Sequence, residues 1–172
     1  MNTLCMLTNE AICERIGHAR DRVIYVAPGL WLDAAKALVN FVRNNGPGKL
    51  AILLDDPPHI CRLGYGEIEA VEILLENGLE VRKCTGLRAG IFIADEEAWF
   101  FSPTPLLVEE GADKKKEFAP NAVIIDVEHA NKLVSSLSPK LAITSRRTGV
   151  ADRWRATRSS STSSPTQLLL RA

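Results

Sequence analysis

Residues 87–102 read LRAGIFIADEEAWFFS, and this stretch decides the fold class. An apolar run ends at Asp95, Glu96 and Glu97, and an aromatic run follows at once. Two apolar runs joined by a tight polar turn are typical of an antiparallel β-hairpin. A doubly wound domain, such as a flavodoxin-like one, would continue with a helix here, so the hairpin argues against that fold.

The segments around the hairpin predict an α/β domain. Helices are predicted over residues 8–20, 31–46 and 67–78, strands over 23–27, 49–56 and 79–84, and a loop over 57–66. After the hairpin, a charged loop over 108–120 precedes a strand over 121–126 and a helix over 127–137. Because short strands alternate with helices before the hairpin, we expect right-handed crossovers and a mixed, mainly parallel sheet flanked by helices.

The chain of 172 residues changes in composition near residue 140. Residues 141–172 hold eleven Ser or Thr, six Arg and one acid, and they contain no Lys or Glu. Such a segment buries too little apolar surface to offset the entropy of ordering, so we predict one domain over 1–140 and a disordered basic tail over 141–172. The tail has two interpretations, of which we favour the second: a basic arm for nucleic acid, or an out-of-frame translation of a GC-rich gene.

Charge and cysteine content limit the possible partners. The whole chain has 21 basic and 21 acidic side chains, but without the tail the balance is 15 to 20. The domain therefore lacks the broad basic surface of a protein that binds duplex DNA. The four cysteines match no zinc spacing and are expected to be reduced. With no signal peptide and no apolar run near the roughly 20 residues of a membrane span, we expect a bacterial-type cytoplasmic protein.

One loop brings polar residues to the carboxyl end of a predicted strand. Asp55 and Asp56 end the second strand, and His59 and Cys61 follow in the loop. Ligands of open α/β sheets gather at this edge, so these groups are a candidate metal or catalytic site. The alternative is that both aspartates cap the loop and that its two prolines make it rigid. Because the spacing matches no strong metal motif and no glycine-rich nucleotide motif occurs, we predict no metal and no cofactor.

Residues 8–140 resemble one half of a phospholipase D-like domain. The resemblance lies in the element order, in the ILLDD strand at 52–56, in the hairpin with Asp95 and in the closing segment NAVIIDVEHANKLVSSL at 121–137. In that family the hairpin carries a His-x-Lys-x(4)-Asp signature and a later Gly-Ser-x-Asn. The resemblance implies that the histidine attacks phosphorus or protonates the leaving oxygen. It also implies that the lysine and the polar groups of the returning strand hold the phosphate.

The signature is degenerate in this chain. Asp95 stands at the aspartate position, but Gly90 stands at the lysine position and Arg88 at the histidine position. The Gly-Ser position falls on Ser102, and prolines follow at 103 and 105. Arg88 stays protonated, so it cannot act as a nucleophile or a base, and Gly90 supplies no charge. We therefore predict a domain without catalytic activity.

The expected function is binding rather than hydrolysis. We expect a non-catalytic module for phosphodiesters, nucleic acid or assembly, with Arg88 as the candidate phosphate ligand. Its alternative role is an ion pair across the hairpin with Glu96 or Glu97. Because the family's site is assembled from two halves, we expect a homodimer through the sheet side that carries the hairpin, or a second half outside this chain. The competing hypothesis is a phosphodiesterase or nuclease that uses the two aspartates and the histidine of the 55–59 segment, or that a second half completes.

Overall fold

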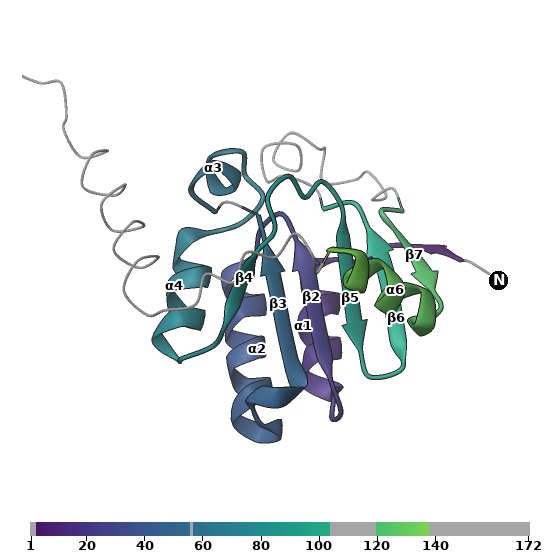
Figure 1. The fold of residues 1–172 in the computed structure, drawn as a ribbon, viewed down its shortest axis with the longest axis horizontal. Helices are drawn as coiled ribbons and strands as arrows, with labels where there is room; N and C mark the ends of the chain where they lie inside the picture. Colours follow the sequence, from purple (N-terminus) through teal and green to yellow (C-terminus); the bar gives the residue numbers. More distant parts are fainter. Residues whose placement is uncertain (1–2, 56, 104–119, 138–172) are drawn as a thin grey trace, which may run out of the picture.

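The computed structural model describes residues 3–55, 57–103 and 120–137. Within them, a seven-stranded sheet has the order β1-β7-β6-β5-β2-β3-β4 (Figure 1). The strands are β1 (Leu4–Cys5), β2 (Val23–Ala27), β3 (Leu50–Leu54), β4 (Val81–Lys83), β5 (Gly90–Ala94), β6 (Glu97–Phe101) and β7 (Ala122–Ile125). The helices are α1 (Asn9–His18), α2 (Leu32–Asn45), α3 (Pro57–Arg62), α4 (Ile68–Glu76) and α6 (Val127–Leu137), with a 3-10 turn η1 at Pro47–Lys49.

The sheet joins a parallel unit to an antiparallel one. β2, β3 and β4 pair in parallel, whereas β5 pairs antiparallel with both β2 and β6. β7 and β1 extend the antiparallel half. The mixed α/β architecture and the late hairpin are confirmed, but the expectation of a mainly parallel sheet holds only for β2 to β4. The tight turn at Asp95 makes the β5–β6 pair antiparallel, because it sends β6 straight back along β5 without the long crossover that a parallel pair needs.

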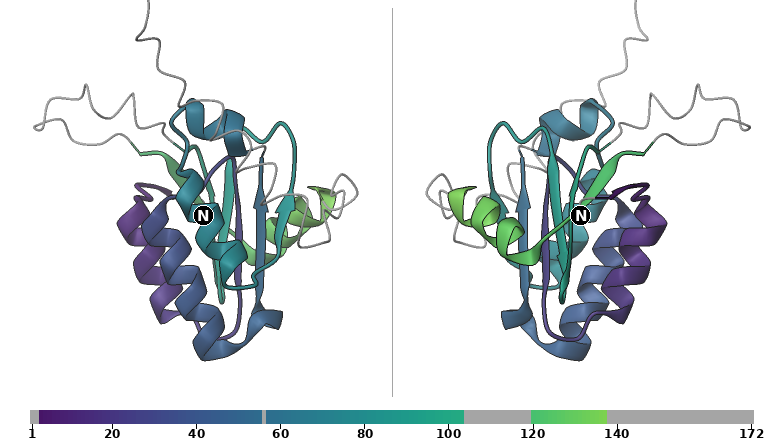
Figure 2. Two further views of the ribbon diagram at one scale, coloured as in Figure 1. Left: turned by 90° about the vertical axis from the view of Figure 1, so that its left-hand side faces the viewer. Right: turned by 90° about the vertical axis from the view of Figure 1, so that its right-hand side faces the viewer.

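Helices cover both faces of the sheet. α1, α2 and α4 lie on one face, and α6 lies on the other (Figure 2). The larger core lies under α1, α2 and α4, where the rings of Phe92 and Trp99 stack with centroids 5.4 Å apart. A smaller core lies between the sheet and α6 and includes Ala130. All five residues of β5 are buried, which explains why this strand reads as a continuous apolar run.

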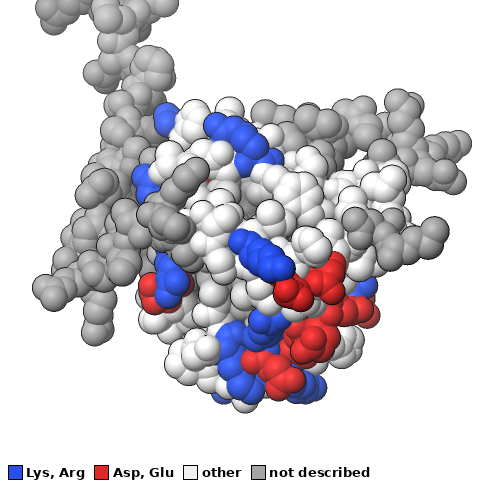
Figure 3. All heavy atoms as spheres, turned by 45° about the vertical axis from the view of Figure 1, so that its right-hand side comes forward, with Lys and Arg blue, Asp and Glu red and all other residues white. Residues whose placement is uncertain are grey.

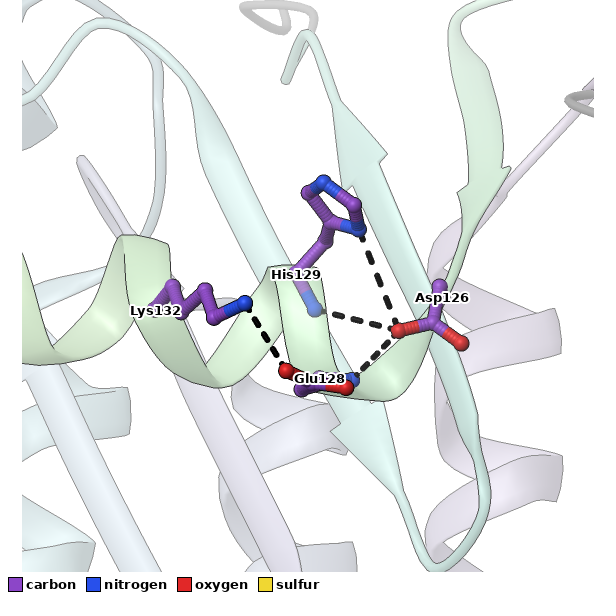
Figure 4. A network of polar contacts seen from close by, with 4 residues as sticks. All are labelled: Asp126, Glu128, His129 and Lys132. Carbon is purple, nitrogen blue, oxygen red and sulfur yellow. Dashed lines mark hydrogen bonds and ion pairs between the residues drawn. The ribbon is translucent and has the colours of Figure 1, made fainter.

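Local capping sets the start of two helices. Thr8 is the N-cap of α1, and its hydroxyl accepts a hydrogen bond of 3.2 Å from the Ala11 N–H. Asp126 caps α6 in the same way, because its Oδ1 accepts from the backbone N–H groups of Glu128 and His129 at 2.8 and 3.2 Å (Figure 4). Glu128 then pairs with Lys132 one turn later at 2.8 Å. Both helices begin within one residue of their predicted positions.

Some segments differ from the sequence-based expectation. Residues 57–62 form α3 rather than a loop, because prolines at the first positions of a helix give up only N–H groups that have no helical partner there. β1 was not predicted, since two residues are too few to show an alternating pattern. The tail over 141–172 and most of the charged loop over 108–120 lie outside the described residues. In the part of the chain that is described, no helix is both long and apolar enough to span a membrane.

Candidate functional site

Arg88 and Asp55 form an ion pair at the edge of the sheet where β2 and β3 end. Arg88 Nη1 lies 3.2 Å from Asp55 Oδ2, and it also donates to the Leu87 carbonyl at 2.7 Å. The two side chains differ in exposure, with 6% for Asp55 and 72% for Arg88. The Asp55 N–H donates to the Pro28 carbonyl at 3.2 Å, which joins this residue to the β2–α2 loop. A buried carboxylate therefore holds one nitrogen of an otherwise exposed guanidinium.

The rest of the Arg88 guanidinium is open to a ligand. Nη1 makes both hydrogen bonds of the side chain, and Nε and Nη2 make none to the described residues. These two nitrogens form the side-on fork of an arginine, which matches two oxygens of a phosphate. Ligands of open α/β sheets also gather at this carboxyl edge. Figure 3 shows basic side chains along the upper edge of the molecule, whereas basic and acidic side chains are mixed over its lower half.

The predicted alternative for Arg88, an ion pair with Glu96 or Glu97, is wrong. Arg88 precedes β5 and the acidic turn follows it, so the five residues of the strand separate them by roughly 16 Å. Glu97 instead pairs with Arg15 of α1 at 2.6 Å. The Arg15 guanidinium also lies 4.3 Å from the centroid of the Trp99 ring. This pair joins α1 to the hairpin at the opposite end of β5.

Gly90, at the lysine position of the signature, is covered by an aromatic ring. It pairs with Phe101 across β5 and β6, and a Cβ atom at position 90 would overlap the Phe101 ring. Phe101 is 4% exposed and belongs to the larger core. The space that a lysine would need is thus part of the hydrophobic core. The glycine and the phenylalanine fit each other and leave no room for a phosphate-binding side chain at position 90.

Asp95, at the aspartate position, holds a loop at the end of β5 opposite to Arg88. Its carboxylate accepts hydrogen bonds of 2.8–3.1 Å from the backbone N–H groups of Arg20, Asp21 and Arg22. Its φ of 51° is a left-handed conformation, which Asp tolerates better than most residues. Burial acts to raise the pKa of Asp95, but the three N–H groups and the charge of Arg20 hold that pKa below its ordinary value. Asp95 therefore clamps the hairpin turn to the α1–β2 loop.

Ser102, at the Gly-Ser position, is exposed just beyond β6. Its N–H donates to the Asn121 carbonyl at 2.8 Å. The Asn121 amide accepts from the Leu7 N–H at 2.8 Å and donates to the carbonyls of Leu7 and Ser102 at 3.1 and 3.4 Å. Asn121 thus ties three segments together, although a lone amide before a short strand gives no signal in the sequence. The proline at position 105 lies outside the described residues.

The described residues of the alternative metal or catalytic site do not form a ligand set. Asp55 pairs with Arg88, His59 is exposed on α3, and Asp56 lies outside the described residues. Cys61 is half-buried, and burial with two nearby glutamates raises the pKa of its thiol to about 11, so it stays protonated at neutral pH. Across residues 3–55, 57–103 and 120–137, no group of three His, Cys, Asp or Glu side chains is placed to hold a metal ion.

Two loops meet at the same edge of the sheet as Arg88. The Glu67 N–H donates to the Leu30 carbonyl at 3.0 Å, and the Leu32 N–H donates to Glu67 Oε2 at 2.7 Å. Gly29 permits this approach, because a Cβ atom there would overlap the Tyr65 carbonyl. The α3–α4 loop is therefore held against the β2–α2 loop, and Glu67 caps α2 from another element. The sequence gives no sign of these contacts, since a cap supplied from a distant loop leaves no local pattern.

A cavity of about 410 Å³ lies at the opposite end of the sheet, between α1 and the hairpin turn. The side chains that line it are mainly ionisable: Glu14, Arg15, His18, Asp95, Glu96 and Glu97. The four carboxylates outnumber the cationic groups, so this cavity repels a phosphate. The cavity and the Arg88 fork are therefore separate features of the molecule.

Comparisons with known proteins show the fold. No family model and no curated protein matches the sequence. Among solved structures, the archaeal chromatin protein TrmBL2 superposes on 84% of this chain with a TM-score of 0.50 and 14% identity. A phosphatidylserine synthase from Haemophilus influenzae Rd KW20 superposes on 88% of the chain with a TM-score of 0.51 and 13% identity. Both likenesses concern the mixed α/β fold that this chain shares with the two proteins.

The chain is shorter than either of these proteins. It spans 53% of the TrmBL2 chain and 41% of the synthase chain, which is about half of each. At such low identities a shared fold carries no activity with it. Function must therefore be argued from the site itself.

Proposed function

We propose that this chain is a non-catalytic phospholipase D-like domain that binds phosphodiesters at the carboxyl edge of its sheet. The observation that carries the proposal is the Arg88 guanidinium, which Asp55 tethers through Nη1 while the Nε–Nη2 fork stays open. Tethering reduces the entropy that the side chain loses when the fork binds two phosphate oxygens. Because Asp55 also offsets the charge of Arg88, the site favours a directed contact at short range over attraction at long range.

The same edge lacks support for hydrolysis of a phosphodiester. Arg88 cannot attack phosphorus or accept a proton, and the Phe101 ring fills the space of a cationic side chain at position 90. His59 has no partner among the described residues that would orient it. The competing hypothesis, hydrolysis by Asp55, Asp56 and His59, gains nothing from this geometry. Binding without turnover is therefore the function with more support.

A nucleic acid is the phosphodiester with most support. TrmBL2, a chromatin protein whose structure shows a mode of DNA binding, shares the fold. The balance of 15 basic to 20 acidic side chains in residues 1–140 disfavours the many phosphate contacts that a duplex requires. We therefore propose a local contact with one or two phosphates of a nucleic acid.

Assembly with a second copy is the other part of the proposal. On the α6 side of the sheet, Leu4 of β1, Val123 of β7 and Phe100 of β6 stand side by side in register. Leu4 is 67% exposed and Phe100 is 41% exposed, and β1 is the last strand of the sheet. The chain also spans only about half of each compared structure. A second copy offers both an apolar partner for this row and a second phospholipase D-like half.

Fluorescence anisotropy with a labelled oligonucleotide tests the binding site. Arg88→Ala should weaken binding about ten-fold, which is the contribution of one charge-assisted contact. Arg88→Lys keeps the charge but removes the fork, so it should also weaken binding. Arg43→Ala is the matched control, because it removes the same charge at the C-terminal end of α2, where Arg43 contacts Asn77.

Two results would overturn the proposal. Equal binding by the Arg88→Ala and Arg43→Ala variants would exclude the fork as the phosphate ligand. Hydrolysis of a phosphodiester substrate by the purified protein, abolished by Arg88→Ala, would show that the domain is an enzyme.

A further inference from the structure

We propose that the phosphodiester bound at the carboxyl edge is a single-stranded nucleic acid whose bases stack on Trp31 and Tyr65. This inference rests on the proposed function and adds the part of the ligand that is recognised. Trp31 precedes α2 in the β2–α2 loop, and Tyr65 lies in the α3–α4 loop. Both loops lie at the edge where Arg88 and Asp55 meet, next to α3 (Figure 1).

Backbone contacts hold the two aromatic residues on adjoining loops. The residues on either side of Trp31 both contact Glu67, since the Leu30 carbonyl accepts its N–H and the Leu32 N–H donates to its carboxylate. Tyr65 lies two residues before Glu67, and its carbonyl packs closely against the β2–α2 loop. The positions of the two residues are therefore fixed before any ligand binds, which reduces the entropy cost of binding.

The hydrophobic core does not account for either aromatic side chain. Both are half-buried, and in the part of the chain that the structure describes, neither belongs to the two core clusters or to the partly buried residues that pack against them. Trp99 and Phe92, by contrast, are 2% and 0% exposed inside the larger core. A large aromatic residue outside the core leaves its apolar area available to a ligand.

Helix capping does not account for Trp31 either. Trp31 stands at the N-cap of α2, and its side chain makes no capping hydrogen bond. Ser, Thr, Asp and Asn are preferred at that position because their side chains satisfy the first N–H groups of the helix. In this protein Glu67 performs that task from the α3–α4 loop. Position 31 thus holds a tryptophan that neither the core nor the helix requires.

Base stacking gives the two aromatic residues a role at the same end of the sheet as the Arg88 fork. A base stacked on an aromatic ring contributes about 1–3 kcal/mol, largely independent of its identity. The Arg88 fork would hold a phosphate of the same strand. In a duplex the bases are already stacked on each other, so rings of this kind select unpaired strands. Stacking also needs no long basic tract, which agrees with the acidic balance of residues 1–140.

Three labelled probes of equal length test the inference on the full chain by fluorescence anisotropy. They are oligothymidylate, an abasic oligomer with the same sugar–phosphate backbone, and a duplex. We expect oligothymidylate to bind about ten-fold more tightly than the other two probes, as stacking of a base or two predicts. The contact with one or two phosphates predicts a shallow salt dependence, with a slope of about −0.7 per phosphate in log K against log salt.

Variants locate the stacking residues. Trp31→Ala and Tyr65→Ala should each weaken oligothymidylate binding about ten-fold, whereas Tyr65→Phe keeps the ring and should bind as the wild type does. Leu63→Ala is the matched control, because Leu63 is 44% exposed in the same loop but has no aromatic ring. Trp31→Phe keeps a smaller ring, so it tests position 31 even if Trp31→Ala disturbs the fold, and it should weaken binding less than Tyr65→Ala does.

The outcomes separate this inference from the proposed function. Equal binding of oligothymidylate and the abasic oligomer, with both weakened by Arg88→Ala, would overturn stacking and leave phosphodiester binding intact. Preference for the duplex would also overturn stacking. Failure of all three probes to bind would overturn both proposals.

Discussion

The ring of Phe101 occupies the space into which a side chain at position 90 would extend. The two residues face each other across β5 and β6, so the absence of a lysine at position 90 is coupled to the packing of the core. A change of one residue alone, from glycine to lysine, would force the long side chain against a buried ring. The site is therefore not one substitution away from the phosphate ligand that the family's signature implies.

Gly90→Ala should lower the free energy of unfolding by about 1–3 kcal/mol, because even a methyl group overlaps the Phe101 ring. Urea denaturation measures this change. Gly17→Ala in α1 is the control, since nothing lies within 4 Å of a Cβ atom there. That variant should raise stability by about 0.5–1 kcal/mol, because alanine loses less entropy in a helix. A neutral Gly90→Ala variant would contradict the packing argument.

The sequence predicts those parts of the fold that depend on local patterns. The continuous apolar run of β5, the acidic turn and the starts of α1 and α6 are each contained in a few neighbouring residues. The strand order could not be predicted in the same way, because the pairing of β5 with β2 and of β1 with β7 joins distant segments. The local alternation of strands and helices therefore suggested more parallel pairing than the sheet contains.

The candidate site shows the same limit. Asp55 and Arg88 are both conspicuous in the sequence, but as members of two separate sites. They lie 33 positions apart in the chain, and only the fold brings them into one ion pair. Glu67, which caps α2 from 35 positions away, has no local signature at all. Trp31 and Tyr65 are candidate ligand contacts because they lie outside the described core clusters, and the sequence alone does not show which aromatic residues are in the core.

Asp95→Asn should lower stability by about 1 kcal/mol at neutral pH, as the loss of a helix cap does. Asparagine tolerates the left-handed conformation of position 95, so the change removes the charge without backbone strain. Because folding lowers the pKa of Asp95, its stabilisation is complete above the ordinary carboxyl pKa of about 4. It is lost as the pH falls through the lower pKa of the folded state.

The pH dependence of urea unfolding checks this clamp. The difference in unfolding free energy between wild type and Asp95→Asn should be constant near neutral pH and shrink in strong acid. Glu96→Gln, in the same turn, is the control and should leave the pH profile of the wild type unchanged. A difference that persists unchanged into strong acid would show that the charge of Asp95 is not what holds the α1–β2 loop.

Arg15 should contribute more to stability than its ion pair does. Glu97→Gln should cost less than about 0.5 kcal/mol, because both side chains of the pair are well exposed. Arg15→Ala should cost about 1 kcal/mol, since it also removes the cation over the Trp99 ring. Thermal unfolding at low and high salt separates the contribution of the ion pair from that of the cation–π contact, because salt screens the ion pair more. Equal losses in the two variants would contradict a role for the ring.

Sedimentation velocity at micromolar concentration tests the assembly of two copies. The exposed row of Leu4, Val123 and Phe100 on the α6 side is the surface that a second copy would cover. We expect the wild type to sediment as a dimer and Phe100→Ser to sediment as a monomer. Phe100 is 41% exposed in the single chain, so its loss should affect association far more than folding. Leu63→Ser, which removes a side chain of 44% exposure in the α3–α4 loop, should leave the dimer intact. A monomeric wild type would exclude this surface as a dimer interface, while binding through Arg88 would remain open to its own test.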